Sequence, residues 1–240
     1  MYEAEIKPHL KAGKTLCCSH GFAYVFNTIV PPADVDVIMV APKGPGTEVR
    51  RVFEEGFGCP GLIAVHQNPS GKARDVALAM AKAEGLTRGG VLECTMAQET
   101  YEDLFGEQNV LCGGLVDLMK YGFETLTEAG YPPEMAYFEC VHEAKLIVDL
   151  IYNGGIQKMN SVISNTAEFG EYYNGPQILP ADVKERMKES LKRIESGKFA
   201  KDWLEEAAKG APNLKAKREA LGQRPVEIVG AKIRSLFERN

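Results

Sequence analysis

The sequence lacks the features that mark membrane and secreted proteins. No run of about 18 apolar residues, the minimum for a transmembrane helix, occurs among the 240 residues. The opening MYEAEIKPHLKAGK has no apolar core of the kind that a secretory signal carries. Six cysteines are scattered without C-x-x-C spacing, which argues against a zinc knuckle and a disulfide framework. We therefore expect a reduced, cytoplasmic protein with no membrane partner.

An excess of positive charge is also missing. The chain has 28 Lys and Arg against 33 Asp and Glu, a formal net charge of −5, which gives no support for a nucleic-acid partner. Two catalytic signatures are absent as well, namely G-x-S-x-G and H-E-x-x-H. Its 45% hydrophobic and 25% charged residues are ordinary for a globular protein with an ample core.

The first part of the chain alternates short apolar runs with helical patterns. The run VDVIMVA at 35–41 is typical of a strand buried on both faces. Further strands are expected at 15–19, 61–66 and 90–94, with helices at 47–55 and at 70–84, the latter capped by Ser70. This alternation predicts an α/β domain with a parallel sheet over residues 1–94.

From about residue 95 the pattern becomes helical. We expect Gly154-Gly155 to end one helix, Pro180 to begin another and Gly197 to end that one. The expected all-helical domain covers residues 95–240, with helices at 99–129, 133–152, 156–170, 180–196, 198–209 and 225–238.

Two acidic pairs lie at helical spacing in this second part, Asp103 with Glu107 and Glu139 with Glu143. Residues four apart share one face of a helix, and the neighbouring residues are apolar, so both faces are expected to be partly buried. Four carboxylates in a buried space would need cations to neutralise them. Oxygen ligands suit Mg²⁺ or Mn²⁺ rather than zinc. The alternative is two solvated acidic helix faces.

Two basic side chains follow expected strands. His20 comes just after the first strand, and Lys43 follows the next one in APKGPG. The carboxyl ends of parallel strands line the ligand crevice of α/β sheets, so a shared site is expected there. The alternatives are a structural histidine and a solvated lysine in a turn. For Ser164, in SNTAE, a helix-capping or helix-interior role is the stronger reading from the residues alone.

Six segments together resemble ketol-acid reductoisomerase, the second common enzyme of branched-chain amino-acid synthesis. The resemblance spans essentially the whole chain and is closest to the shorter class of that family. It implies part of a Rossmann-like α/β domain followed by a knotted-type all-helical domain that binds metal and dimerises. The segments are HGF at 20–22, VDVIMVAPKGPG at 35–46, DLFGEQNVLCGG at 103–114, AYFE at 136–139, HEAKLIVDLIYNGG at 142–155 and SNTAEFGEY at 164–172.

The resemblance implies a metal centre with two Mg²⁺ ions. Asp103 would bridge them, with Glu107 on one side. Glu139 and Glu143 would complete the metal and substrate site, in that family often from across a dimer interface. The ions would act as Lewis acids while an alkyl group migrates in a 2-acetolactate-type 2-hydroxy-keto acid, which NADPH then reduces.

The remaining implied roles concern the sheet side and the substrate. His20 and Lys43 would line the reaction centre, and Ser164 would hold the substrate carboxylate. Gly46 would approach the nicotinamide cofactor. The family's opening strand and glycine-rich loop have no counterpart in these residues, so we expect the NADPH site to be incomplete in this chain.

Several alternatives remain open at this point. The chain could be a metal-dependent isomerase or lyase that does not reduce its substrate, or a truncated, non-catalytic paralogue that only dimerises. It could also be a split enzyme in which a separate chain supplies the nucleotide-binding segment. In each case two apolar helices and open strand edges favour a homodimer or larger homo-oligomer.

Overall fold

A computed structural model describes residues 1–237 and divides the chain into two compact units. The first unit spans Met1–Leu104 and the second begins at Phe105. The division falls ten residues after position 94 because the first turns of helix α5 belong to the core of the sheet unit, where Met96 is 3% exposed. The domain boundary expected near residue 94 stays a prediction.

The first unit is a small α/β structure. Its four strands lie within one or two residues of the expected positions, so the four expected strands are confirmed. The elements are η1 (Tyr2–Ile6), η2 (Lys7–His9), β1 (Thr15–Cys18), α1 (Phe22–Val25), β2 (Asp36–Pro42), α2 (Gly46–Glu54), β3 (Gly61–Gln67), α3 (Ala73–Ala83), α4 (Leu86–Gly89), β4 (Val91–Glu93) and α5 (Met96–Gly106).

The sheet has the order β1-β2-β3-β4 and is mixed, so the expectation of a parallel sheet is wrong. β1 runs parallel to β2, and β3 runs parallel to β4, but β2 and β3 are antiparallel. The reason lies in the connection that carries α2. Pro42 pairs with Gly61, and the Lys43 amide donates to the Pro60 carbonyl at 2.8 Å, so the chain re-enters the sheet at the edge where it left.

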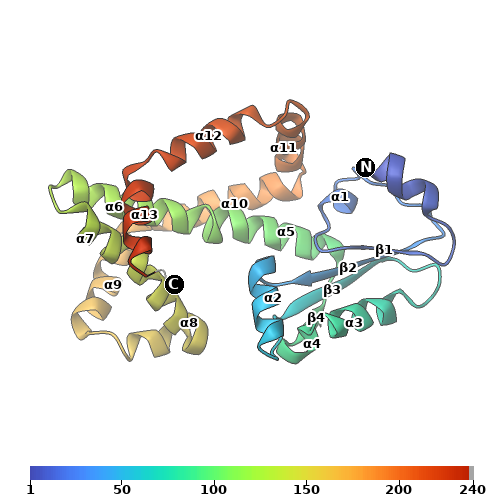
Figure 1. Ribbon diagram of the computed structural model, residues 1–240, viewed down its shortest axis with the longest axis horizontal. Helices are drawn as coiled ribbons and strands as arrows, with labels where there is room; N and C mark the ends of the chain where they lie inside the picture. The colour runs from blue at the N-terminus through green and yellow to red at the C-terminus, as the bar shows by residue number, and fades with distance from the viewer. Residues whose placement is uncertain (238–240) are drawn as a thin grey trace. The chain divides into compact units, whose positions relative to one another are not determined.

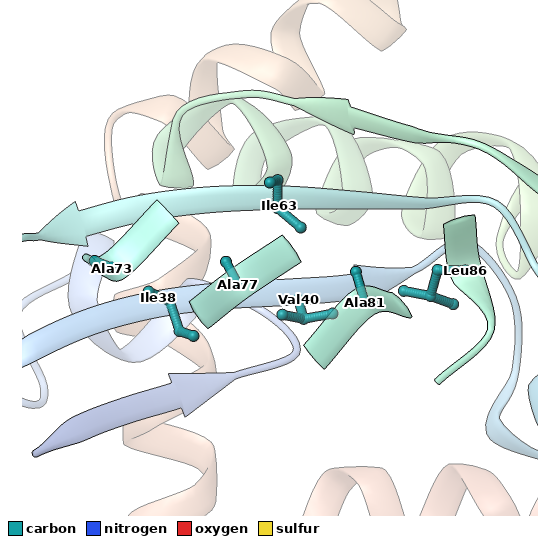
Figure 2. Close-up of a cluster of buried hydrophobic side chains, with 7 residues drawn as sticks. All are labelled: Ile38, Val40, Ile63, Ala73, Ala77, Ala81 and Leu86. Atoms are coloured by element: carbon teal, nitrogen blue, oxygen red, sulfur yellow. The ribbon is translucent and has the colours of Figure 1, made fainter. Parts of the chain in front are cut away.

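The central strand β2 is buried on both faces, as its unbroken apolar run indicates. Ile38 and Val40 point to the face that α3 covers, where Ala73, Ala77 and Ala81 allow close approach of the helix (Figure 2). The opposite face holds the remaining strand residues against α1 and the start of α5. Its buried members are Tyr24, Val37, Met39, Ala41, Ala64 and Met96.

Ser70 does not cap α3 as expected. The N-cap position is Lys72, which makes no side-chain cap. Ser70 Oγ instead accepts from the Lys72 amide and donates to the buried Asp36 carboxylate at 2.5 Å. Asn68 caps the helix instead, because its Oδ1 accepts a hydrogen bond from the Ala73 amide at 3.0 Å.

The second unit is helical (Figure 1). Two expected long helices are each interrupted by a π-helical turn, and α12 was not expected. The elements are η3 (Glu107–Leu111), α6 (Gly114–Glu128), α7 (Pro133–Tyr137), η4 (Phe138–His142), α8 (Glu143–Asn160), α9 (Asn165–Ile178), α10 (Ala181–Glu195), α11 (Lys198–Ala208), α12 (Pro212–Gly222) and α13 (Pro225–Ser235). The expected helix at 225–238 ends at Ser235, and its residue 238 lies outside the described residues.

The glycine and proline signals act largely as expected. Gly155 leaves helical geometry, at φ 78° and ψ 174°, and kinks the segment, although helical structure resumes and continues to Asn160. The helix expected at 156–170 is therefore split between the end of α8 and α9. Pro180 precedes α10, and Gly197, at φ 75°, separates α10 from α11.

The core of the second unit forms where α13 packs against α6 and α7. It comprises Phe123, Ala136, Tyr137, Val226, Val229 and Ile233. Arg234 of α13 adds a hydrogen bond of 2.9 Å to the Tyr137 hydroxyl. Across residues 1–237, no helix has the length and apolar character needed to cross a membrane.

Candidate active site

Four charged or titratable side chains meet in the first unit. Lys43 Nζ donates to Glu99 Oε1 at 2.8 Å and lies 3.5 Å from Asp103 Oδ1. His20 Nε2 lies 3.3 Å from the other carboxylate oxygen of Asp103. Asp103 is thus held between a lysine and a histidine, with about a third of its side chain, 30%, exposed.

The sheet explains why these side chains meet. His20 follows β1 by two residues, and Lys43 directly follows β2. The two strands are parallel, so their carboxyl ends lie at one edge, where α5 passes with Glu99 and Asp103. The expected proximity of His20 and Lys43 is present in the structure, while their roles stay predictions.

Gly21 allows α5 to approach this edge. A Cβ atom on Gly21 would lie 2.4 Å from Met96 Cγ and 2.4 Å from Thr100 Oγ1, and 3.1 Å from the Met96 carbonyl oxygen. Thr100 is fully buried and donates to that same carbonyl at 2.8 Å, so neither group can easily move away. The absence of a side chain next to His20 therefore sets the distance between α5 and the sheet.

Glu99 is the residue that sequence reasoning missed. It is only 1% exposed, and one of its oxygens, Oε2, has no hydrogen-bond partner in the described structure. A buried carboxylate is costly without a cation, which Lys43 supplies. The signal that could have found it is the spacing of Glu99, Asp103 and Glu107, each four residues from the next.

The charge state of Lys43 follows from this environment. Burial lowers the pKa of Lys43, but the hydrogen bond and charge of Glu99, with the charge of Asp103, outweigh it. The pKa of Lys43 is therefore raised above its ordinary value, and the side chain is a cation at neutral pH. It can stabilise negative charge but cannot act as a base there.

His20 presents a proton to the site. Its Nδ1 accepts a hydrogen bond from the Phe22 amide at 3.2 Å. Because Nδ1 is an acceptor, the neutral imidazole carries its proton on Nε2, the nitrogen that faces Asp103. That buried nitrogen is close to Asp103 Oδ2 but is not aligned with it as a hydrogen bond, so its proton remains available to another acceptor.

Three of the four predicted metal carboxylates are exposed in the isolated chain, which corrects the expectation of buried faces. Glu107 begins η3, Glu139 lies within η4, and Glu143 begins α8. All three are exposed, and so are apolar neighbours of the second pair, with Leu146 at 52%. Within residues 1–237, no three His, Cys, Asp or Glu side chains gather in a group that could hold a metal ion. The metal roles stay predictions.

Ser164 and Gly46 occupy the ends of helices. Ser164 is the N-cap of α9, where its Oγ accepts from the Ala167 amide at 3.1 Å. The capping role that the residues favoured is therefore confirmed, and a substrate role stays a prediction. Gly46 is the first residue of α2, and a Cβ there would meet nothing within 4 Å.

Two family models cover almost the whole chain. Residues 1–90 match "Acetohydroxy acid isomeroreductase, NADPH-binding domain", and residues 96–239 match "Ketol-acid reductoisomerase, C-terminal domain". The chain is 99% identical over 240 residues to a ketol-acid reductoisomerase (NADP(+)) of Akkermansia muciniphila, covering all of this chain and 74% of that protein. It is 67% identical to a ketol-acid reductoisomerase (NAD(+)) of the uncultured archaeon GZfos26G2, covering 99% of this chain and 71% of that one.

Solved structures agree with these matches. The structure of an NADH-preferring ketol-acid reductoisomerase from an uncultured archaeon matches with a TM-score of 0.97 and 66% identity, covering 99% of this chain and 72% of the other. An NAD-binding semialdehyde dehydrogenase protein from Cupriavidus necator matches at 21% identity, with a TM-score of 0.54, covering 80% of this chain and 72% of that one. The second likeness concerns the fold alone.

Proposed function

Because the chain belongs to the ketol-acid reductoisomerase family, we propose that it rearranges and reduces a 2-acetolactate-type 2-hydroxy-keto acid in branched-chain amino-acid biosynthesis. The observation that carries the proposal is the position of Asp103 between Lys43 and His20. A carboxylate held by two such side chains at the carboxyl edge of two parallel strands is suited to a reaction centre rather than to a solvated helix face.

The proposed metal is Mg²⁺. The donor set fits it, because Asp103, Glu107, Glu139 and Glu143 offer only carboxylate oxygens, which hard divalent ions prefer. Asp103, Glu107, Glu139 and Glu143 would hold the ions. When bound, the ions supply Lewis-acid polarisation of the substrate's alcohol and carbonyl oxygens.

The chain's own residues would then orient the substrate and balance charge. In the rearrangement, the alkyl group leaves C2 with its bonding electrons and bonds to the neighbouring carbonyl carbon. C2 becomes a ketone as its hydroxyl loses a proton, and the former carbonyl becomes a hydroxyl. Lys43, held as a cation by Glu99, would stabilise the developing alkoxide, and the Nε2 proton of His20 would hydrogen-bond to it.

Ser164 has the geometry to bind the substrate carboxylate while it caps α9. Its oxygen accepts from the Ala167 amide, which leaves the hydroxyl proton to donate. A carboxylate placed there would also lie at the positive end of the α9 dipole. The same serine would thus support the helix and the substrate at once.

The proposed hydride donor is a reduced nicotinamide cofactor, NADPH. The relative that is 99% identical is named for NADP(+), whereas the archaeal relative is named for NAD(+). Gly46, which opens α2 without a side chain, would let the cofactor approach the backbone. The hydride would reduce the C2 ketone left by the rearrangement.

The helical domain is proposed to be of the knotted type and to form a homodimer. Large apolar side chains of α8 and α9 are exposed in the isolated chain, with Tyr152 at 81% and Phe169 at 67%. The same segments carry Glu143 and Ser164. A second copy that covers this surface would desolvate those side chains.

The decisive experiment incubates the chain with 2-acetolactate, with and without Mg²⁺ and with and without NADPH, and identifies the products. The proposal expects a rearranged, reduced dihydroxy acid only when both are present, with NADPH at high concentration because the cofactor site is expected to be incomplete in this chain. A rearranged 2-keto acid that accumulates even with NADPH would favour the isomerase alternative. No product under any condition would favour the non-catalytic one.

The metal role of Asp103 has its own test. We expect Asp103→Asn to abolish tight Mg²⁺ binding, measured by calorimetry, and turnover, because a bridging ligand compensates both ions. Glu107→Gln should have a smaller effect. Asp34→Asn is the matched control, since Asp34 is exposed and has no ion pair in the described structure. Unchanged Mg²⁺ affinity in Asp103→Asn would contradict the assignment.

A further inference from the structure

A pocket lies within the helical unit. It has a volume of about 420 Å³ and opens between the η3–α6 junction and helix α10. Gln108 and Asp117 line it from the first side, and Arg186, Ser190 and Arg193 line it from α10. The volume is sufficient for a small ligand.

Two polar groups in this pocket have unused hydrogen-bonding capacity. Ser190 is only 8% exposed, and its hydroxyl makes no hydrogen bond within residues 1–237. Gln108 Nε2 is buried and likewise lacks an acceptor in the described structure. A buried donor without an acceptor is unfavourable, and most native structures avoid it. The Gln108 amide therefore indicates a missing acceptor, and the Ser190 hydroxyl is free to donate to the same acceptor.

The charges on α10 define what that acceptor is. Arg186, Ser190 and Arg193 are spaced i, i+4 and i+7, which places them on one face of the helix. Arg186 is paired with Asp182 at 3.0 Å. Arg193 has no ion pair in the described part of the chain, so its guanidinium is available.

Acidic groups near the pocket do not remove this positive charge. Asp117, on the pocket wall, forms an ion pair with Lys120. Glu189, next to Ser190 on α10, is paired with Lys192 at 2.6 Å. Lys192 lowers the pKa of the Glu189 carboxyl, and Arg193 is close enough to add to this effect, but Arg193 forms no ion pair in the described structure, so its guanidinium donors are unused beside two further hydrogen-bonding groups.

We propose that this pocket binds a small oxyanion of the phosphate class, either inorganic phosphate or a phosphate monoester. Arg193 would supply the fork of N–H donors that matches two phosphate oxygens. The Ser190 hydroxyl and Gln108 Nε2 would donate to the remaining oxygens. The first residue of α6, Gly114, also lines the pocket, so the positive end of that helix adds to the attraction. None of the proposed metal and substrate residues lines this pocket, and Gln108 follows Glu107 in the chain.

Calorimetric titration of the full chain with inorganic phosphate, at constant ionic strength set with chloride, tests the proposal. We expect one saturable site per chain. Arg193→Gln should weaken it about tenfold or more, and Ser190→Ala several-fold, because each removes a donor to a charged acceptor. Arg218→Gln is the matched control: Arg218 is an exposed arginine of α12 without an ion pair in the described structure, and its variant should bind as the unmodified chain does.

Three results would overturn the proposal. One is the lack of saturable phosphate uptake, and another is equal weakening in Arg218→Gln, which would indicate unspecific charge attraction. The third comes from sedimentation equilibrium. If phosphate neither binds nor changes the association of the chains, but Arg193→Gln reduces that association, then the pocket accommodates a carboxylate of a second copy instead. Thermal melts of each variant, monitored by circular dichroism, establish that it is folded.

Discussion

At the residue scale, Gly21 and Lys43 make the cluster around Asp103 possible in different ways. Gly21 provides the space in which α5 approaches the sheet, and Lys43 supplies the cation that a buried carboxylate requires. One is a steric condition and the other an electrostatic condition. Each can be removed without touching Asp103 itself.

We expect Gly21→Ala to lower the free energy of unfolding by about 1–3 kcal/mol, the usual cost of overpacking a well-packed site. The added Cβ would meet Met96 and the buried Thr100 at 2.4 Å. Urea denaturation measures the loss. Gly222→Ala is the control, because a Cβ at Gly222 meets nothing within 4 Å. Equal stability of the two variants would show that α5 can shift away from the sheet.

Lys43→Met should destabilise the chain more than Glu99→Gln does. It leaves the Glu99 carboxylate, 1% exposed, without its cation. The expected loss is about 1–3 kcal/mol, below that of a fully buried pair because Lys43 itself is 36% exposed. Denaturation of both variants at pH 7 measures the difference. A larger loss in Glu99→Gln would contradict the order.

The pH dependence of that loss has a definite sign. The pKa of Lys43 is raised in the folded chain, so its stabilising effect is fully present below the unfolded value. It disappears only as the pH rises through the folded pKa. The difference in stability between the unmodified chain and Lys43→Met should therefore stay constant from pH 7 to about pH 10.

At the element scale, Ser164 at the start of α9 has two roles, the helix cap and the proposed binding of substrate, and substitution can separate them. Aspartate caps a helix about as well as serine, whereas alanine does not. We expect Ser164→Asp to keep the thermal stability and to raise the KM for substrate, because its charge repels the substrate carboxylate. Ser164→Ala should raise the KM and also lower the free energy of unfolding by about 1 kcal/mol. Unchanged KM in Ser164→Asp would remove Ser164 from the substrate site.

At the scale of the whole molecule, the exposed apolar side chains of α8 and α9 predict association. We expect a dimer or larger assembly at micromolar concentration, measured by multi-angle light scattering. Tyr152→Lys should weaken it, because Tyr152 is 81% exposed on α8. Leu92→Lys is the control in the sheet unit, where Leu92 is 71% exposed. A monomer mass for the unmodified chain would contradict the prediction.

The sequence predicted the strands and most helices because their apolar patterns are local. It did not predict the antiparallel pairing of β2 with β3, which depends on where the connection through α2 re-enters the sheet. Glu99 was missed because its burial depends on Lys43, 56 residues earlier in the chain. Met96 and Thr100 pack against Gly21 for an equally non-local reason.

Proximity at the candidate site was predictable only in part. His20 and Lys43 were placed together because both follow parallel neighbouring strands. The roles of Glu139 and Glu143 rest on family membership, since both are exposed in the isolated chain. The π-helical turns η3 and η4 have no recognised sequence signal, so the two long helices were predicted to be continuous.

Those two turns bear on how this chain can change by insertion and deletion. A π turn corresponds to an α-helix that has gained one residue, and such turns often occur at functional sites. Deleting one residue from η4 would restore regular α-helical geometry while removing the extra residue from that turn. A deletion between Glu139 and Glu143 would place them three residues apart instead of four, which changes the relative direction of the two carboxylates on their shared face. Single-residue deletions in η3 or η4 should therefore be tolerated by the fold and rejected by selection for activity.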